Sequence, residues 1–401
     1  MTTRKKSNNI RLINFKGVIG LNIKYELIIS SGNVTLKEHV KPASNDFKID
    51  CKDCIISPGF IDPQVNGMGS CSFWDITKQS FNEIDNIRLK LAYCGIVAFC
   101  PTIITGPIEK IISSIDYINS YIKQAKEEDG SQILGIHIEG IFITKYGIHD
   151  SKYIQNELIV KNIEPLIKEN VILFTLAPEL DKTGEVIKLL QKNNILVSIG
   201  HSNSTYRQGL YAINELGLNT VTHMFNALRG CDGFNHRGNG TTSLNILKEK
   251  LENEKNIDPD KDGIMLALLK NRNVLCMVIA DGIHVNKEVI KLLREYKDPA
   301  HFSLATDIVS KDFYDHNILH GKLGGGQSTL DICVSNLIKW KVSNIEDCLT
   351  FASKPFSNKL KNTKQQGLGE IKIGQKANIT IWDTKNNAVK GTIIGENIFL
   401  N

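Results

Sequence analysis

Eight short apolar runs, separated by segments with helical spacing, constrain the fold of this chain more than any other feature. The runs lie at residues 57–67, 95–102, 133–140, 171–179, 195–201, 220–226, 274–282 and 302–307. Their interiors are almost continuously apolar, as expected for strands that are buried on both faces. Amphipathic segments such as 108–125 and 184–193 fill most of the gaps. Strict alternation of strand and helix predicts a parallel sheet, and eight such units indicate an α/β fold of the (β/α)8 TIM-like barrel type.

The alternative architecture is an open, doubly wound sheet, which is disfavoured because no Gly-rich dinucleotide fingerprint follows the first run. Short alternating runs fill residues 1–56, and similar runs fill the stretch from Gly367 to Leu400. This period-2 spacing predicts small antiparallel strands. We therefore expect a small β-sandwich domain formed from both termini, residues 1–56 plus 357–401. The barrel domain, residues 57–356, is inserted between its two parts.

Composition excludes several classes of protein. No run approaches the ~20 apolar residues of a membrane helix, and the N-terminus lacks the apolar region of a secretory signal. The nine cysteines are scattered, and Cys51 and Cys54 form a CxxC without a second pair, which favours a reducing cytoplasm over a disulfide framework. The net charge of +5 is spread along the chain, so nucleic acid is not an expected partner. The charged run near 248–263 is expected to be a solvated helix face or a mobile insertion, rather than a functional site.

The stretch from Val197 to Ala227 contains two neighbouring runs that each end near a histidine. His201 closes the first run and His223 lies in the second, with a helix-like segment between them. Ser204 and Thr205 are good N-cap candidates for that segment, and Gly217 is placed to stop it. The C-terminal ends of neighbouring parallel strands lie side by side at one edge of a sheet. Two imidazoles at one edge predict a metal site.

Polar side chains close other runs as well. Gln64 and Asn66 lie at the end of the first run, Glu139 ends the third, His284 follows the seventh, and Asp307 ends the eighth. Each alone has an ordinary structural interpretation, such as a helix cap or a hydrogen-bonded polar residue. In barrels of this type, however, the working residues gather at the C-terminal ends of the strands. The convergence of so many polar groups on one edge therefore indicates a functional site.

Glu139, His201 and His223 offer one oxygen and two nitrogens, a donor set that suits zinc or a similar divalent ion with one position open for water. Such an ion lowers the pKa of the water toward neutrality. Asp307 would act as a general base toward the water and later as a general acid toward the leaving group. His149 and His284 are candidates to orient or polarise a substrate carbonyl. The residues therefore predict metal-assisted hydrolysis of a C–N or C–O bond, with iron, cobalt or manganese as alternatives to zinc.

With these residues in place, the chain resembles the amidohydrolase superfamily and, within it, the N-acetylglucosamine-6-phosphate deacetylases. The resemblance rests on PGFIDPQVNG, GIVAFCPT, LGIHIEGIF, TLAPE, GHSNS, VTHMFNAL, IADGIHV and ATD, in that order, and the closing GEIKIGQKANITIWD is similar to the superfamily's usual final strand pair. Most relatives carry HxH on the first strand and bind a second metal there. Gln64 and Asn66 occupy those positions here, as in the deacetylases, where a single metal is usual.

The resemblance implies a role for each matching residue. Glu139, His201 and His223 match the family's metal ligands, and Asp307 matches its acid/base. The substrate-binding matches are Ile148, His149, Asn226, Ala227, Arg237, His284, Leu323, Gly324 and Gly325, of which Arg237 matches a phosphate-binding arginine that often acts across a dimer interface. The implied reaction removes the acetyl group from N-acetylglucosamine 6-phosphate to give glucosamine 6-phosphate and acetate, in a homodimer.

Four places depart from the family's usual motifs, and the polar insertion after residue 247 is longer than usual. Ile141 stands where EGPF has proline, HRGNG replaces HRDPG around Arg237, LGGGQS replaces an LSGS-like turn, and Asn378 replaces the first Asp of a late motif. None of these is a ligand or the acid/base. Two other interpretations remain: a hydrolase of another N-acyl amino-sugar phosphate or a cyclic amide, and a catalytically silent barrel used as a scaffold. The silent barrel is disfavoured because such relatives usually lose ligands.

Overall fold

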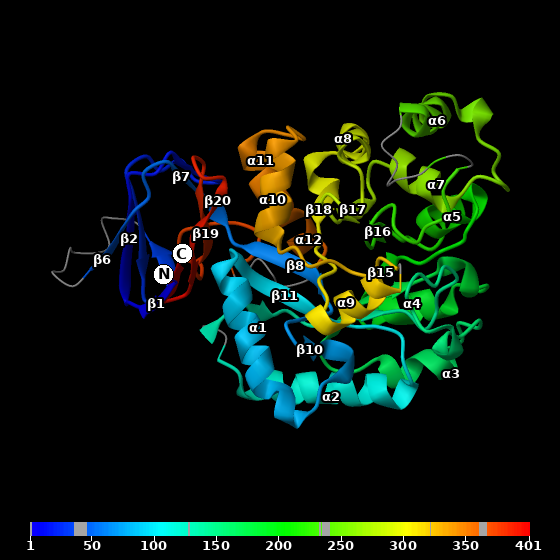
Figure 1. The fold of residues 1–401 in the computed structure, drawn as a ribbon, viewed down its shortest axis with the longest axis horizontal. Helices are drawn as coiled ribbons and strands as arrows, with labels where there is room; N and C mark the ends of the chain where they lie inside the picture. The colour runs from blue at the N-terminus through cyan, green and yellow to red at the C-terminus, as the bar shows by residue number, and fades with distance from the viewer. Residues whose placement is uncertain are drawn as a thin grey trace.

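A computed structural model describes residues 2–35, 46–126, 129–231, 234, 241–320, 322–360 and 367–401. A barrel of parallel strands forms its larger part (Figure 1). In order around the barrel, the strands are β8 (Phe60–Val65), β11 (Ile96–Ile103), β13 (Ile136–Glu139), β14 (Val171–Leu176), β15 (Leu196–Ile199), β16 (Thr220–Val221), β17 (Leu275–Val278) and β18 (Phe302–Leu304). The predicted (β/α)8 TIM-like barrel is confirmed. A short strand, β12 (Gln132–Ile133), adds to β11.

The barrel closes between its first and last strands through side chains as well as backbone. Val65 at the end of β8 forms a parallel bridge with Ile308, just beyond β18. Deeper in the barrel, the hydroxyl of Thr306 donates to Asp62 Oδ2 at 2.6 Å. Burial raises the pKa of the Asp62 carboxyl to about 7. These contacts bring the C-terminal ends of β8 and β18 together, so polar residues that follow the two strands can meet.

Helices cover the outside of the barrel (Figure 1). They are α1 (Phe81–Tyr93), α2 (Ile108–Gln124), α3 (Val160–Ile163), α4 (Glu185–Lys192), α5 (Tyr206–Asn214), α6 (Thr241–Glu252), α7 (Ile264–Lys270), α8 (Lys287–Tyr296), α9 (Lys311–Leu319), α10 (Leu330–Lys339), α11 (Ile345–Phe351) and α12 (Lys354–Ser357). The local sequence explains the limits of α5. Thr205 and Gln208 form a capping box at its start, and Gly217, with φ +67°, follows its end. No described helix combines the length and apolar character needed to cross a bilayer.

Two further sheets are built from both ends of the chain, and both termini lie on this part of the molecule (Figure 1). One has the order β1 (Thr3–Lys6), β21 (Asn397–Leu400), β20 (Ala388–Ile394), β19 (Asn378–Asp383), β7 (Cys54–Pro58), β3 (Gly17–Val18); the other has the order β5 (Asn33–Thr35), β4 (Glu26–Ser30), β2 (Asn9–Ile13), β6 (Phe47–Asp50). Leu12 and Ile29 from one sheet share an apolar cluster with Ile379 and Ile393 from the other. The sheets therefore pack face to face as a β-sandwich.

Two sequence expectations are wrong in detail. The small sheets are not purely antiparallel, because β2 pairs in parallel with β6, and β3 with β7. The chain reverses direction at β4 and again at β5 before β6 joins the free edge of β2. The sixth barrel strand, expected over 220–226, spans only Thr220–Val221. Positive φ angles at His223 and Phe225 turn the chain out of the strand.

The sandwich contacts the barrel at the beginning of β8 and β11. The ring centroids of Phe60 and Trp382 lie 6.2 Å apart, and the Thr380 hydroxyl donates to the carbonyl of Gly95 at 2.6 Å. Gly95 has φ +84°, and a Cβ there would lie 2.9 Å from Thr380 Cγ2. The contact therefore involves the N-terminal ends of these strands, opposite the edge where the candidate site lies.

The domain boundaries at 56/57 and 356/357 stay a prediction. A minor ribbon, β9 (Gly67–Met68) with β10 (Cys71–Ser72), follows β8.

Candidate active site

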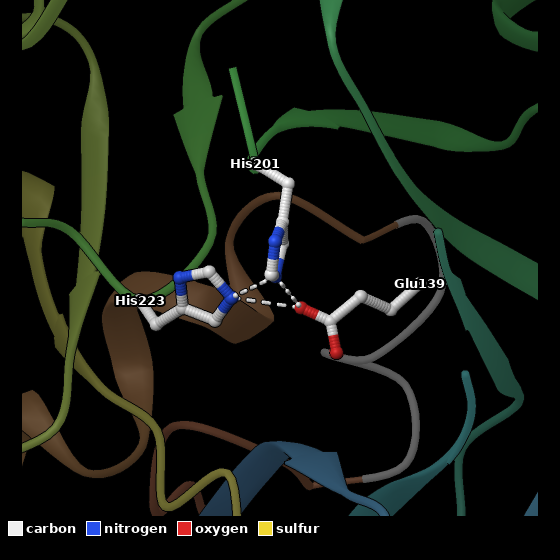
Figure 2. A group of neighbouring side chains, drawn as sticks. All are labelled: Glu139, His201 and His223. Atoms are coloured by element: carbon white, nitrogen blue, oxygen red, sulfur yellow. Dashed lines mark hydrogen bonds and ion pairs between the residues drawn. The ribbon is translucent and has the colours of Figure 1, made fainter. Parts of the chain in front are cut away.

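Three buried side chains from successive parts of the barrel point toward one another (Figure 2). His223 Nε2 lies 2.8 Å from Glu139 Oε1 and 3.1 Å from His201 Nε2. His201 Nε2 lies 3.4 Å from the same carboxylate oxygen. Among the described residues, this is the only group of three His, Cys, Asp or Glu side chains whose ligand atoms lie within 4.8 Å of one another. The donor types and their spacing fit a single divalent ion.

The backbone is strained where it delivers these groups. His201, His223 and Asp307 have φ angles of +48°, +32° and +52°, in the left-handed region that side chains disfavour by roughly 1–2 kcal/mol. Each residue lies two or three positions beyond the end of its strand, β15, β16 or β18. Strain of this kind persists only where the surrounding structure imposes it, and it gathers at functional sites. The three turns aim the side chains inward across the mouth of the barrel.

Backbone contacts fix the orientation of His201. Its Nδ1 lies 2.6 Å from the carbonyl oxygen of Lys145, so a proton on Nδ1 donates to that oxygen and Nε2 keeps its lone pair. The carbonyl of His201 in turn accepts from the backbone N–H groups of Thr144 and Lys145, at 2.9 and 2.8 Å. Metal-ligating histidines typically have such a partner at the second ring nitrogen. The loop after β13 therefore holds His201 as a ligand.

Two amide side chains, Gln64 in β8 and Asn66 directly after it, hold the carboxylate of Asp307. Gln64 Nε2 donates to Asp307 Oδ1 at 2.8 Å, and Asn66 Nδ2 donates to the same oxygen at 2.6 Å. Gln64 Nε2 also donates to Glu139 Oε2 at 2.9 Å. The first strand thus supplies amide donors that lie between two carboxylates. Because amides do not bind divalent ions as imidazoles do, this pattern fits a site with one metal.

Burial and the neighbouring charges shift the pKa values of these groups. Burial raises the pKa of Glu139, but the imidazoles of His201 and His223 beside its carboxylate outweigh this effect and hold the pKa well below its usual range. Burial lowers the pKa of His223, but the hydrogen bond to Glu139 reverses this and raises it to about 9. Burial, with the charge of Glu139, raises the pKa of Asp307 to about 6. The Glu139 carboxylate therefore favours positive charge at the place where the donor set fits a cation.

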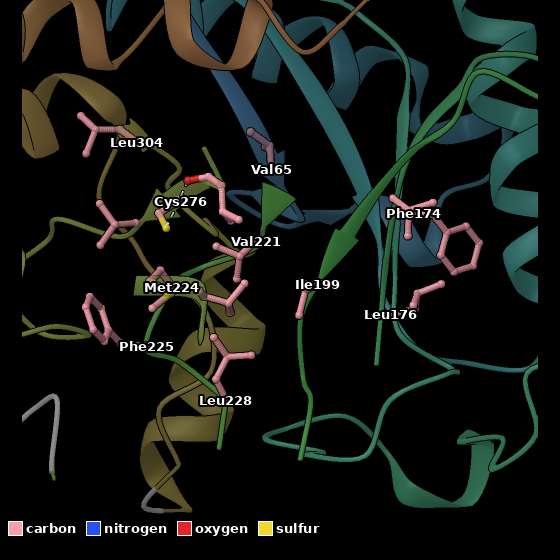
Figure 3. Packing of buried hydrophobic residues seen from close by; sticks show 14 of the residues in the cluster. Val65, Phe174, Leu176, Ile199, Val221, Met224, Phe225, Leu228, Cys276 and Leu304 are labelled. Carbon is pink, nitrogen blue, oxygen red and sulfur yellow. Dashed lines mark hydrogen bonds between the residues drawn. The ribbon is translucent and has the colours of Figure 1, made fainter. Parts of the chain in front are cut away.

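The segment that carries His223 is anchored by apolar side chains (Figure 3). Val221, Met224 and Leu228 belong to the main apolar cluster of the barrel. Between these anchors, His223 and Asn226 line the cavity. Asn226 is only 8% exposed, and neither its amide nitrogen nor its carbonyl oxygen has a hydrogen-bond partner. Buried polar atoms without partners are rare, so Asn226 is placed to meet a ligand.

The cavity has a volume of about 270 Å³ and opens at the C-terminal edge of the barrel. It brings together nearly all of the predicted site residues: Asn66, Glu139, Ile148, His149, His201, His223, Asn226, Ala227, His284, Asp307, Leu323, Gly324 and Gly325. Gln64 lies behind it, bonded to Glu139 and Asp307. Arg237 and the HRGNG segment lie outside the described residues.

Two further histidines face the cavity with one ring nitrogen committed to the protein. His284 Nδ1 lies 2.7 Å from Asp281 Oδ2, and its Nε2 has no partner. His149 Nδ1 lies 2.7 Å from the hydroxyl of Thr105. Burial, with the nearby His201, lowers the pKa of His149 to about 3, so its ring is neutral. Each histidine can therefore present Nε2 to a polar substrate group.

The Gly-rich turn over the cavity is tied to the loop that carries Asp307. The backbone N–H of Gly326 donates to the carbonyl of Asp307 at 2.8 Å. A Cβ on Gly324 would lie 2.4 Å from Ile148 Cδ1, and Gly325 has φ +70°. Only glycine allows this close approach and this backbone angle. The LGGGQS sequence thus closes one side of the cavity against Ile148.

Three residues that support the site were not predicted from the sequence: Thr105, Lys145 and Asp281. Asp281 carried a signal, because it lies at the end of the seventh apolar run, as Asp307 ends the eighth. Thr105 and Lys145 lie in loops without any periodic pattern. Their roles depend on tertiary contacts with His149 and His201.

Ile141 shows how the loop after Glu139 departs from the pattern with proline. Ile141 is buried with φ +55°, and its N–H donates to the Thr105 hydroxyl at 3.0 Å. Proline requires φ near −65° and has no N–H. We expect Ile141→Pro to destabilise the fold by roughly 2 kcal/mol or more, measured by urea unfolding. Ile141→Val, which keeps the N–H, is the control and should cost about 1 kcal/mol. Equal stability of the two variants would contradict this account.

The chain is similar to known proteins in both sequence and structure. No protein-family model matches the chain. The N-acetylglucosamine-6-phosphate deacetylase of Danio rerio is 28% identical over 381 residues, covering 88% of this chain and 87% of that protein. The crystal structure of N-acetylglucosamine-6-phosphate deacetylase from Pasteurella multocida superposes with a TM-score of 0.78 at 23% identity, covering 98% of this chain and 100% of that one.

A substituted form of the Mycobacterium smegmatis N-acetyl-D-glucosamine-6-phosphate deacetylase, in complex with N-acetyl-D-glucosamine-6-phosphate, superposes with a TM-score of 0.77 at 18% identity. It covers 97% of this chain and 99% of that one. These superpositions show the fold. The sequence similarity over most of the chain confirms the resemblance to the deacetylase family noted from the motifs.

Proposed function

We infer that this chain is a metal-dependent N-acetylglucosamine-6-phosphate deacetylase, which hydrolyses the acetamide of its substrate to glucosamine 6-phosphate and acetate. One observation carries the inference. In a chain that is similar to these deacetylases over 88% of its length, a single cavity brings together Glu139, His201 and His223 with the amide-held Asp307. That combination is what hydrolysis of an amide with one metal ion needs.

The catalytic chemistry is divided between the ligand group and Asp307. A divalent ion held by Glu139, His201 and His223 would act as a Lewis acid and lower the pKa of a water molecule. Asp307 takes a proton from the attacking water, and its pKa of about 6 suits a base that works near neutral pH. Gln64 and Asn66 bond Oδ1, which leaves Oδ2 for the proton. Asp307 then returns the proton to the amine nitrogen as the C–N bond breaks.

The remaining residues of the cavity orient the sugar. Asp281 holds Nδ1 of His284, which leaves Nε2 of that ring available to substrate. Thr105 holds Nδ1 of His149 and leaves its Nε2 available in the same way. Either imidazole can polarise the amide carbonyl or bind a hydroxyl. Asn226 and Ala227 are proposed to contact the sugar phosphate. Arg237 is proposed to bind the phosphate from the partner subunit of a homodimer, because an arginine fork matches two phosphate oxygens.

We propose zinc as the ion, because two imidazoles and one carboxylate with an open position suit it; iron, cobalt and manganese fit the same donors. We also propose that the enzyme works in amino-sugar metabolism in the cytoplasm. All nine cysteines lie in the described part of the chain and none of them is in a disulfide there, which supports a reducing compartment.

A panel of substrates tests this function against its alternatives. The panel contains N-acetylglucosamine 6-phosphate, unphosphorylated N-acetylglucosamine, a second N-acyl amino-sugar phosphate and a cyclic amide. We expect the highest kcat/KM for the first compound. A preference for the third or fourth would assign a different substrate to the same chemistry. Purified protein with less than about half an equivalent of any divalent ion, and without activity on the panel, would favour a silent barrel.

A further inference from the structure

Lys145 places a positive charge on the wall of the cavity, and no carboxylate pairs with it in the described part of the chain. The side chain is half-buried, and its Nζ donates to the carbonyl of Leu228 at 3.1 Å. A neutral carbonyl only partly compensates a half-buried ammonium. Glu139 is the cavity-lining carboxylate nearest to Lys145 in the sequence. Its oxygens already contact His201, His223 and Gln64. Lys145 therefore has capacity to bind an anion.

The groups around the Lys145 ammonium also lack acceptors. Leu228 directly follows Asn226 and Ala227, so its contact with Nζ places the ammonium at their end of the cavity. The buried Asn226 amide donates to nothing, and the N–H of Ala227 donates to no backbone oxygen among the described residues. An ammonium, a side-chain amide and a backbone N–H together suit a group with several acceptor oxygens, such as a phosphate.

A second cation strengthens the positive character of this end. Arg229 bonds only carbonyl oxygens in the described structure, those of Asn203, Asp260 and Lys261. Arg229 directly follows Leu228, whose carbonyl accepts the hydrogen bond from the Lys145 ammonium. The cavity therefore combines carboxylates that are held by amides and imidazoles with the ammonium of Lys145, which no described carboxylate pairs with.

We propose that Lys145 is a specificity-determining residue whose ammonium binds the 6-phosphate of the amino-sugar substrate. This proposal rests on the proposed function and adds a phosphate contact from within the same subunit. The backbone carbonyl of Lys145 orients His201 at 2.6 Å, while its side chain reaches Leu228. One residue therefore links the metal ligand to the phosphate end and helps to set the distance between the reacting amide and the phosphate.

Kinetics of Lys145→Met on two substrates test the proposal. This variant removes the charge and keeps the backbone carbonyl and most of the apolar stem. For N-acetylglucosamine 6-phosphate we expect KM to rise about 10- to 100-fold with kcat changed less than about threefold, because the lost contact is to a part of the substrate that does not react. For unphosphorylated N-acetylglucosamine, kcat/KM should stay unchanged. Bound metal should stay at the wild-type level, and Lys145→Arg should restore part of the affinity.

Lys152→Met is the matched control, because Lys152 lies in the same loop, is exposed and pairs with Asp150 at 3.0 Å. It should leave all these quantities unchanged. An unchanged KM in an active Lys145→Met variant, or equal losses on both substrates, would overturn the proposal. Calorimetric binding of glucosamine 6-phosphate to the metal-loaded protein separates this proposal from the proposed function. Affinity at least tenfold weaker in Lys145→Met supports the phosphate contact even without turnover, and equal affinities contradict it.

Discussion

We expect Asp307→Asn to lower kcat for acetate release by about 10³-fold while the protein keeps its fold and its metal. Asparagine has nearly the same shape, and its side-chain oxygen can still accept the hydrogen bonds from Gln64 and Asn66 that Asp307 Oδ1 accepts at 2.8 and 2.6 Å. It cannot, however, take a proton from water at neutral pH. The effect should therefore fall on kcat rather than on KM.

Steady-state kinetics, with metal analysis of the same sample, measure this effect. Asp312→Asn is the matched control, because Asp312 is an exposed carboxylate in the helix that follows Asp307. It should retain full activity. If Asp307→Asn keeps its metal and more than about a tenth of the wild-type kcat, Asp307 is not the acid/base.

We expect His223→Ala to lose both the metal and the activity, and Asn226→Ala to keep the metal and raise KM. His223 contributes one of three ligands, and the loss of a ligand from a site with three protein donors abolishes tight binding. Asn226 lies three residues further along the same anchored segment, and its side chain forms no hydrogen bond with the proposed metal ligands. Its removal should weaken substrate binding about tenfold through a lost hydrogen bond to the sugar phosphate.

Elemental analysis of both variants after dialysis measures the bound metal, and near-UV circular dichroism shows that each is folded. His223→Ala should hold less than about a tenth of an equivalent, and Asn226→Ala should match the wild type. Loss of metal from both variants would show that the segment 221–228 acts as one unit and that metal binding and substrate binding are not separate along it.

The barrel was predictable because a parallel strand buried on both faces leaves a nearly continuous apolar run, and a polar residue at the end of such a run is conspicuous. Glu139, His201 and Asp307 each follow this rule. The sandwich was predicted as a whole, but the parallel pairing of β2 with β6 was not. Alternating apolar residues show which face of a strand is buried, and they carry no information on the direction of its neighbour.

Other features of the site depend on tertiary structure and left no trace in the sequence pattern. The φ of +55° at Ile141 is imposed on a β-branched residue by surrounding contacts, against its intrinsic preference. The role of Lys145 depends on two bonds to segments far along the chain, from its carbonyl to His201 and from its ammonium to Leu228. Only the folded chain brings these partners together.

The most direct test of the central claim is the reaction itself, followed by its products. Metal-loaded protein is incubated with N-acetylglucosamine 6-phosphate, and acetate and glucosamine 6-phosphate are quantified over time beside an Asp307→Asn sample. The account predicts that both products accumulate in a one-to-one ratio, that chelation of the metal stops the reaction and that added metal restores it. Acetate release no faster than that of the Asp307→Asn sample, from wild-type protein with a full equivalent of bound metal, would contradict it.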